Sequence, residues 1–142
     1  MSEFSYRAET RVRESHTMPV LGRTAHVIGI GAFEGQADFA DGQVASHRYE
    51  GWFDLVDGSG RFHGYALWRF EDGSEIRAAY DGTARKAEAG GFAVDARFRD
   101  LSGTGRFADI AGDGGFRGHR VEPIEQGGST HLTGTLNLRP AA

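Results

Sequence analysis

Five Asp-Gly pairs divide the chain and restrict its fold more than any other feature of the sequence. They are Asp41-Gly42, Asp57-Gly58, Asp72-Gly73, Asp81-Gly82 and Asp113-Gly114. Both residue types tolerate positive φ, so the pair is a strong signal for a β-hairpin. The first three pairs follow at intervals of about 15 residues, which is one strand and one tight turn each. Since no stretch shows sustained helical spacing of apolar residues, the sequence predicts an all-β chain of hairpins.

Alternating apolar and polar residues predict eight strands. Segment 60–70, for example, places Phe62, Ala66 and Trp68 on one face and mostly polar residues on the other. Such alternation is typical of strands with one buried face. The expected strands are 4–13, 25–34, 44–56, 60–70, 74–84, 92–98, 114–121 and 130–138. A Gly-rich connection is expected over 101–113, with a short helical turn at Phe107–Ala111.

Glycine flanks phenylalanine on one strand face at three places, in the motif Gly-x-Phe-x-Gly at 31–35, 60–64 and 114–118. Such glycines let a sheet coil sharply and let a ring lie over bare backbone. Short antiparallel strands with glycine kinks predict an eight-stranded up-and-down β-barrel, because closure removes the sheet edges. We expect one domain over residues 1–142, with its barrel core at about 4–138.

Small residues on the inward faces favour a central apolar cavity over a solid barrel. These residues are Gly64, Ala66, Ala78, Gly82 and Ala96. An eight-stranded barrel can be filled by its own side chains or can hold one small ligand. The sequence therefore predicts an open interior.

Composition excludes several classes of function. The chain has 16 basic and 20 acidic residues, a net charge of −4 and a pI near 5.8, so nucleic acid is not an expected partner. It has no cysteine, which excludes disulfides and Cys-based metal sites or nucleophiles. The lack of a long apolar run and the polar first residues predict a cytoplasmic protein without a signal peptide or membrane contact.

Sequence motifs for nucleotide cofactors and for common hydrolytic or metal chemistry are absent. We find no G-x-G-x-x-G, P-loop, HExxH, G-x-S-x-G or EF-hand motif. The six histidines are scattered, and no two have the spacing of a ligand pair. We therefore predict neither a cofactor nor a metal, with a metal site assembled across strands as the alternative.

Three polar residues on inward faces are candidates for catalysis. His47 and Tyr49 share the inward parity of Phe53, which places an imidazole beside a phenol. They could act as an acid–base or hydrogen-bonding pair on a substrate carbonyl, or form a structural pair near the barrel mouth. Tyr80 lies between Ala78 and Gly82, where a ligand oxygen could satisfy its hydroxyl, or it is an ordinary core residue.

Seven residues are candidates for substrate binding, namely Tyr6, Phe33, Phe53, Phe62, Trp68, Phe98 and Arg120. The rings would form cavity walls or pack as core. Arg120 shares the inward parity of Phe116, so its guanidinium could hold a substrate carboxylate or pair with a neighbouring acid.

Two further questions of orientation concern outer and inner faces. In segment 25–34, either Val27 and Phe33 or His26 and Glu34 face the interior. Trp52 has the outward parity of its strand, so an exposed ring there would mark a subunit contact.

The run from Gly103 to Gly118 resembles the signature of the allene-oxide-cyclase-like barrel superfamily, which includes dirigent-type proteins. In that pattern a Gly-Thr-Gly-Arg-Phe turn leads to a Gly-x-Gly-x-Phe-x-Gly strand, as at 103–107 and 112–118. Segment 64–74, which closes on Asp-Gly-Ser, is also similar, and the likeness extends over roughly 25–138.

The resemblance implies an eight-stranded barrel with an apolar cavity that forms a homodimer or homotrimer. Activities known in the superfamily include cyclisation of fatty-acid epoxides, control of radical coupling and cyclisation of polyketides. The matching positions are structural glycines and aromatic residues, so no catalytic residue is carried over from the superfamily.

Three hypotheses for function follow. The first is a cofactor-independent cyclase or isomerase that holds an apolar unsaturated substrate in a reactive conformer and hydrogen-bonds one of its oxygens. The second is a non-catalytic carrier or sensor of a hydrophobic small molecule in the same cavity. The third is a solid barrel with a structural role, which the small inward residues disfavour.

Overall fold

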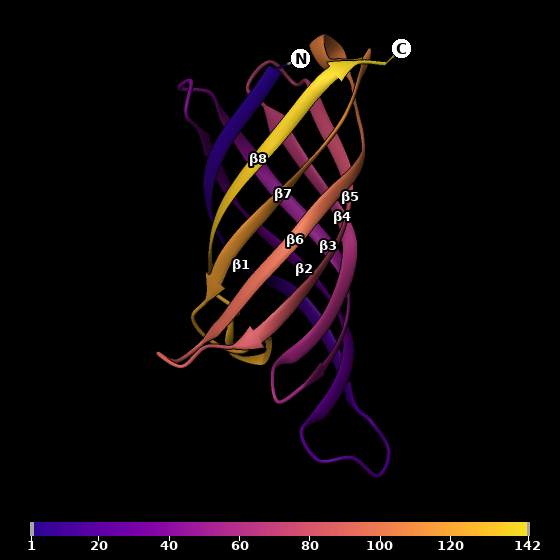
Figure 1. The fold of residues 1–142 in the computed structure, drawn as a ribbon, viewed down its shortest axis with the longest axis vertical. Coiled ribbons are helices and arrows are strands. Elements are labelled where there is room, and N and C mark those ends of the chain that lie inside the picture. The colour runs from indigo at the N-terminus through magenta and orange to yellow at the C-terminus, as the bar shows by residue number, and fades with distance from the viewer. Residues whose placement is uncertain (1, 142) are drawn as a thin grey trace.

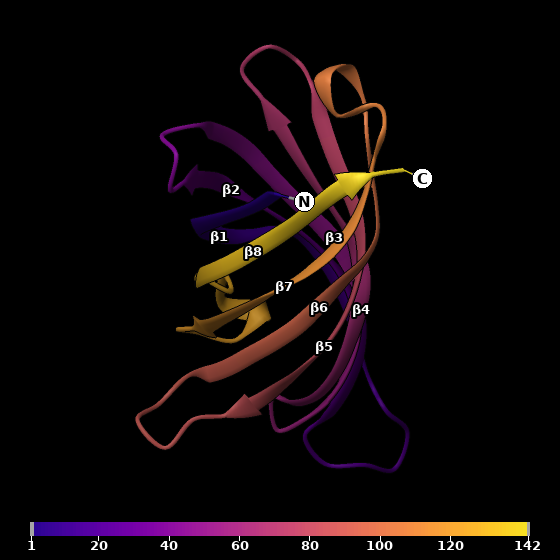
Figure 2. The ribbon, with the colours of Figure 1, turned by 45° about the horizontal axis from the view of Figure 1, so that its top comes forward.

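The computed structural model describes residues 2–141, and their eight antiparallel strands close into a barrel. The strands follow one another around the wall in chain order, and β8 pairs with β1 (Figure 1). They are β1 (Ser2–Pro19), β2 (His26–Phe39), β3 (Val44–Val56), β4 (Ser59–Phe70), β5 (Glu75–Lys86), β6 (Phe92–Gly103), β7 (Ile110–Arg120) and β8 (Thr130–Pro140). The predicted all-β, up-and-down barrel is confirmed, and Figure 2 shows its wall from a second direction.

Three of the five Asp-Gly pairs form the predicted turns, and two do not. The pairs at 41–42, 57–58 and 72–73 connect consecutive strands from β2 to β5. At 57–58 both residues have positive φ, 51° and 80°, as a two-residue hairpin requires. The pairs at 81–82 and 113–114 lie inside β5 and β7, where the ladders to neighbouring strands continue through them.

The Gly-rich connection is shorter than expected over 101–113. Strand β6 continues to Gly103 and β7 begins at Ile110. The helical turn between them is η1 (Gly105–Phe107), which begins two residues before the expected turn at Phe107–Ala111. Its last hydrogen bond runs from the Ala108 N–H to the Gly105 carbonyl. A second single turn, η2 (Ile124–Gln126), lies between β7 and β8. No helix in residues 2–141 is both long enough and apolar enough to cross a membrane.

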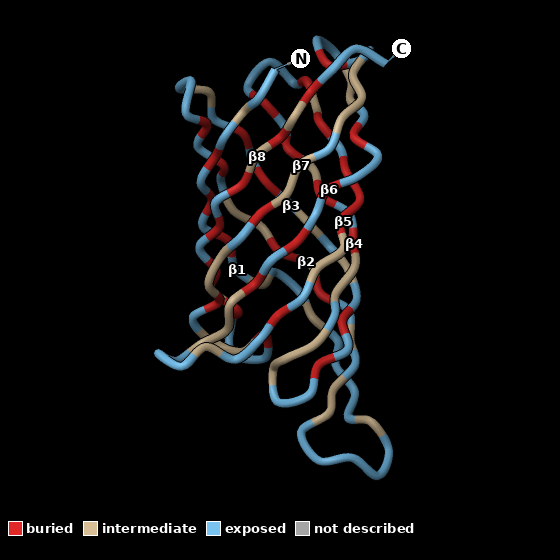
Figure 3. The backbone as a smooth tube through the Cα atoms, viewed as in Figure 1, coloured by how far each residue is buried: buried red, intermediate tan, exposed pale blue. Residues whose placement is uncertain are grey.

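Strands β1 and β2 extend beyond the closed wall as a hairpin. The pairing of β1 with β8 ends at Thr10, whereas its pairing with β2 continues past a bulge between Val12 and Glu14 to Pro19. The hairpin projects from one end of the barrel, and its tip is exposed (Figure 3). The sequence alternation predicted a shorter first strand, 4–13, because the bulge changes the parity of the residues that follow.

Side chains alternate between interior and surface along the strands, as predicted. Trp68, Ile76, Phe98 and Leu136 represent the expected inward faces of β4, β5, β6 and β8, and all four are buried. In β2 the inward set contains Phe33, which is 6% exposed. His26 and Glu34 therefore lie on the outer surface, where they pair with Asp54 and Arg11.

Aromatic rings of one strand fill the gaps at glycines of the next. A Cβ atom added to Gly134 would lie 2.3 Å from the Tyr6 ring, and one added to Gly82 would lie 2.5 Å from the Phe62 ring. A Cβ at Gly64 would likewise meet the Tyr80 hydroxyl at 2.5 Å. The predicted packing of rings over bare backbone is confirmed. It also means that the small inward residues create room for rings rather than for a large cavity.

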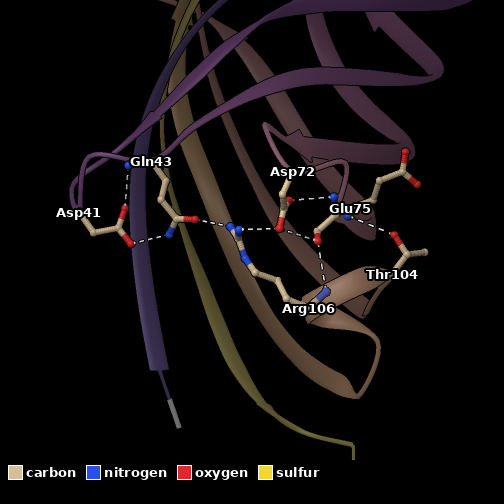
Figure 4. A network of polar contacts seen from close by, with 7 residues as sticks. Asp41, Gln43, Asp72, Glu75, Thr104 and Arg106 are labelled. Carbon is tan, nitrogen blue, oxygen red and sulfur yellow. Dashed lines mark hydrogen bonds and ion pairs between the residues drawn. The ribbon is translucent and has the colours of Figure 1, made fainter.

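A polar network fixes the loops at the barrel end opposite the hairpin (Figure 4). The Arg106 guanidinium, from η1, lies over the Phe70 and Phe107 rings at 4.9 and 4.6 Å. It donates to the Asp72 carboxylate at 3.0 Å and to the Gln43 side-chain carbonyl. The Arg106 side chain thus joins three interstrand loops, β2–β3, β4–β5 and β6–β7, and these loops cover this end of the barrel.

Candidate functional site

A small apolar cavity lies inside the barrel, displaced toward the end that holds η2. Its volume is about 30 Å³, room for a few atoms only. Its walls come from every strand except β1, and from η2. They include Phe33, Tyr49, Phe53, Leu55, Phe62, Tyr80, Val94, Phe116, Arg120, Ile124, Thr130 and Leu132. The predicted apolar cavity exists, but rings at the inward glycines make it smaller than the small residues suggested.

A second hollow of about 170 Å³ adjoins this cavity at the barrel mouth. Leu55, Arg120 and Ile124 line both spaces, so the two are neighbours. The other walls of the hollow include the apolar Val27 and Phe92, with acidic side chains among the lining residues. We refer to the cavity and the hollow together as the lower chamber. Because Arg120 lines both spaces, a molecule in the mouth hollow would contact apolar walls, acidic side chains and the Arg120 side chain.

Arg120 is the charged group of the inner wall. It is the last residue of β7 and only 8% exposed, and it lies opposite Phe92 of β6 and Thr130 of β8. Its guanidinium carbon lies 6.0 Å from the centre of the Phe33 ring, and its Nε–H has no hydrogen-bond partner in the described part of the chain, residues 2–141. No carboxylate of residues 2–141 lies within 4.0 Å of the guanidinium, so the alternative of a salt bridge to a neighbouring acid is not realised. Burial lowers the pKa of Arg120, yet an arginine side chain remains protonated in proteins.

Tyr49 projects from β3 into the same space. Its ring stacks on Phe33 at 4.7 Å with an interplanar angle of 10°, and its hydroxyl lies 2.6 Å from the Thr10 hydroxyl. Burial raises the pKa of Tyr49 to about 12, although the bond to Thr10 and the charge of Arg120 oppose this shift. The phenol is therefore protonated at neutral pH, and it can donate to a ligand oxygen when Thr10 donates to it.

Tyr80 projects from β5 toward Tyr49, at 6.1 Å between ring centres in an edge-to-face arrangement. Burial is also the main cause that raises the pKa of Tyr80, with Tyr49 adding to it and Arg120 opposing it. The structure thus brings together three of the predicted residues, Tyr49, Tyr80 and Arg120. Phe33, Phe53 and Phe62 supply apolar walls of the same cavity, as predicted.

His47 lies outside the lower chamber, in the filled part of the core. Its imidazole stacks on the Trp68 indole at 4.7 Å, and its Nδ1–H donates to the Leu67 carbonyl at 3.1 Å. Burial lowers its pKa to about 4, so the imidazole is neutral at pH 7. The ring centres of His47 and Tyr49 are 5.3 Å apart. Of these two residues, Tyr49 lines the chamber and His47 does not. We therefore place His47 in the supporting core of the site.

The three other predicted binding residues, Tyr6, Trp68 and Phe98, also pack in this filled part of the core. Trp68 contacts both of the other rings edge to face, at 5.7 and 5.0 Å. The Tyr6 hydroxyl and the Trp68 Nε1–H are buried without a partner in residues 2–141. These rings do not line the lower chamber.

Sequence reasoning missed three residues of the site, of which Ile124 and Pro123 line the chamber and Thr10 forms a hydrogen bond with the Tyr49 hydroxyl. Thr10 shares the inward parity of Tyr6 and Ala8, so its position was detectable in the alternation of β1. Ile124 and Pro123 belong to the connection between β7 and β8, which carries no periodic signal. This connection is held against β1 by a hydrogen bond from the Val12 N–H to the Gly127 carbonyl, a contact between distant segments.

Trp52 has the predicted outward orientation. Its side chain is 48% exposed and lies beside the exposed Ile30 and Tyr65, on an outer hollow of about 320 Å³. A role in subunit contact stays a prediction. No group of three His, Asp or Glu side chains within residues 2–141 is arranged to hold a metal ion.

The lower chamber can stabilise negative charge on a bound oxygen. The two phenols and the guanidinium are all protonated at neutral pH, so each can donate a hydrogen bond. Donors aimed into a water-poor apolar space act more strongly than the same donors in water. The arrangement therefore suits an apolar ligand that carries a carbonyl or anionic oxygen.

Comparisons of the chain with protein-family models, curated proteins and solved structures find no match.

Proposed function

We propose that this chain is a cofactor-independent cyclase or isomerase that takes a small apolar, unsaturated molecule into the lower chamber. The observation that carries the proposal is the grouping of Tyr49, Tyr80 and Arg120 at the inner end of an apolar space that adjoins the barrel mouth. Such a site holds the carbon skeleton by apolar contact and fixes its orientation through one oxygen.

Ring closure within one molecule that transfers no proton, such as a pericyclic step, suits this donor set. No atom enters or leaves, so the step needs no co-reactant. Charge that develops on the substrate oxygen is stabilised by the phenols and the guanidinium, and the walls restrict the substrate to a reactive conformer. The raised pKa values of Tyr49 and Tyr80 make these phenols donors rather than bases. The resemblance of residues 103–118 to a superfamily with cyclase members is in line with this proposal.

Turnover by wild-type protein and two tyrosine variants tests the proposal. The purified protein is incubated with a small-molecule extract of its source cells, and bound and released molecules are compared by mass spectrometry. We expect a bound apolar molecule to be converted into an isomer of identical mass. Tyr49→Phe and Tyr80→Phe should each slow that conversion by about 100-fold, the cost of losing one oxyanion donor. Tyr65→Phe, at an exposed tyrosine on the outer surface, is the matched control.

The second candidate is a carrier or sensor of the same kind of molecule. It is favoured by one observation: within residues 2–141 no imidazole lines the chamber, and its acids, Asp57 and Glu125, line only the mouth hollow. A carrier would release its ligand unchanged from wild-type protein and variants alike. Conversion that is equally fast in wild type and both phenylalanine variants would instead contradict the assigned donors.

A further inference from the structure

The buried Arg120 guanidinium lacks the partner that a buried charge normally has. Arginine is almost never nearly fully buried unless it is paired, because transfer of a charge out of water is costly. Here the side chain is 8% exposed, its Nε–H is unsatisfied, and no ion pair to it exists within residues 2–141. A group that is costly in the empty site becomes favourable when a ligand supplies the missing acceptor.

We propose that the ligand of the lower chamber is a carboxylate, held by Arg120 at the inner end with its apolar body toward the mouth. This inference rests on the proposed function, since it names the class of molecule that the same chamber takes. The planar guanidinium presents donors that match the two oxygens of a carboxylate. The neighbouring phenols of Tyr49 and Tyr80 can donate to the same oxygens.

The surroundings of Arg120 favour a singly charged, small ligand. Among residues 2–141, Arg120 is the only cation that lines the cavity or the mouth hollow, whereas Asp57 and Glu125 line the mouth hollow. A phosphate dianion would pass these acids and find one compensating charge, so a monocarboxylate is the better match. The walls that remain, Val27, Leu55 and Phe92, are apolar and would contact a hydrocarbon body.

Glu125 is the acid that could compete with a ligand for the guanidinium. Its charge acts on Arg120 and raises that residue's pKa, but the glutamate side chain is exposed and forms no ion pair with it. The guanidinium carbon instead lies 6.0 Å from the centre of the Phe33 ring, and Phe33, Tyr49 and Tyr80 line the same cavity as Arg120. An entering carboxylate therefore does not have to displace a salt bridge.

Calorimetric titration with a matched pair of probes tests the inference. trans-Cinnamate and trans-cinnamamide have the same hydrocarbon body and differ in charge. We expect wild-type protein to bind cinnamate about 10- to 100-fold more tightly than cinnamamide, as charge-assisted hydrogen bonds predict. Arg120→Met should remove this preference and keep the affinity for the amide. Arg120→Lys should keep part of the preference, because the charge remains.

Arg117→Met is the control, since Arg117 lies on the same strand and is exposed. It should behave as wild type, and circular dichroism verifies that each variant is folded. Equal binding of both probes by wild type, or an unchanged preference in Arg120→Met, would overturn the carboxylate assignment while leaving the chamber as a binding site. Failure of both probes to bind any of these proteins would overturn the proposed function and the inference together.

Discussion

Arg120 shows how a single residue can oppose stability and favour ligand binding. Its guanidinium is buried without an acidic partner at the inner end of the lower chamber. Burial of an unpaired charge is costly, and even a buried ion pair can often be replaced by apolar residues of similar volume with a neutral effect or a gain of about 1–4 kcal/mol. Residues kept for binding or catalysis commonly show this conflict between stability and function.

Arg120→Met should therefore raise the free energy of unfolding by about 1–3 kcal/mol, because it removes an uncompensated buried charge and keeps the volume. Urea denaturation measures the change through the transition midpoint at constant slope. Arg117→Met, at an exposed position of β7, should stay within about 0.5 kcal/mol of wild type. A loss of stability in Arg120→Met would show that Arg120 is a structural side chain and contradict its assignment.

His47 links stability to pH through burial. Desolvation lowers its pKa from 6.5 to about 4 in the folded protein. Between these two values the unfolded chain binds a proton that the folded protein does not, so stability falls as pH falls. The full contribution is present above pH 6.5 and is lost progressively toward pH 4.

His47→Asn should remove this dependence, because the amide can still donate to the Leu67 carbonyl but does not titrate. Unfolding by urea between pH 7 and pH 4.5 should show wild type losing up to about 3 kcal/mol more than the variant. Identical profiles for wild type and His47→Asn would show that burial of His47 does not shift its titration.

At the scale of elements, neighbouring strands fit together by placing rings over glycines. Tyr6 of β1 lies directly opposite Gly134 of β8, at the seam where the barrel closes. The three atoms nearest to a Cβ at Gly134 all belong to the Tyr6 side chain. The space available for a larger residue at position 134 is therefore limited by this side chain and not by neighbouring backbone. An aromatic–glycine pair thus packs at the seam.

Gly134→Ala should lower the free energy of unfolding by about 1–3 kcal/mol, because the Tyr6 ring has to move within a packed core. Tyr6→Leu shortens the opposing side chain and should make the alanine much less costly. A double-mutant cycle measured by denaturation isolates this coupling. Costs that simply add in the double variant would mean that the ring does not occupy the glycine gap.

The elements were predictable where a local pattern decides them. Period-2 alternation gave the inward faces of β3 to β6 and of β8, and positive-φ residues gave the turn at 57–58. The pattern misplaced features that depend on partners far away in the chain. The bulge after Val12 follows from pairing with β2 beyond the wall, and η2 is fixed by its contact with β1.

At the scale of the whole molecule, the two ends of the barrel differ. Arg106 joins the loops at one end through Asp72 and Gln43, and the interior beneath it is filled by rings. The other end carries the lower chamber, with η2 beside it. The mouth hollow therefore opens at one end of the barrel, and Arg120 lines both this hollow and the inner cavity.

Membership of the site was predictable in part from the sequence, but its shape was not. Parity placed Tyr49, Tyr80 and Arg120 inside the barrel, and the structure brings all three together. Parity also predicted His47 as a site residue, because the alternation identifies the face of a strand on which a side chain lies. It does not identify the position of that side chain along the barrel axis. The volume of the cavity could not be predicted from the alternation of apolar and polar residues either, since it depends on which ring fills the space at each inward glycine.

The most direct test of the account is a crystal structure of the protein with 4-bromocinnamate, in which anomalous scattering locates the bromine. We predict a bromine peak in the mouth hollow near Phe92, with the carboxylate at the Arg120 guanidinium and the phenols of Tyr49 and Tyr80. A lower chamber that stays empty of ligand at saturating concentration, or a ligand held only on the outer surface near Trp52, would contradict the account and leave the barrel a structural role.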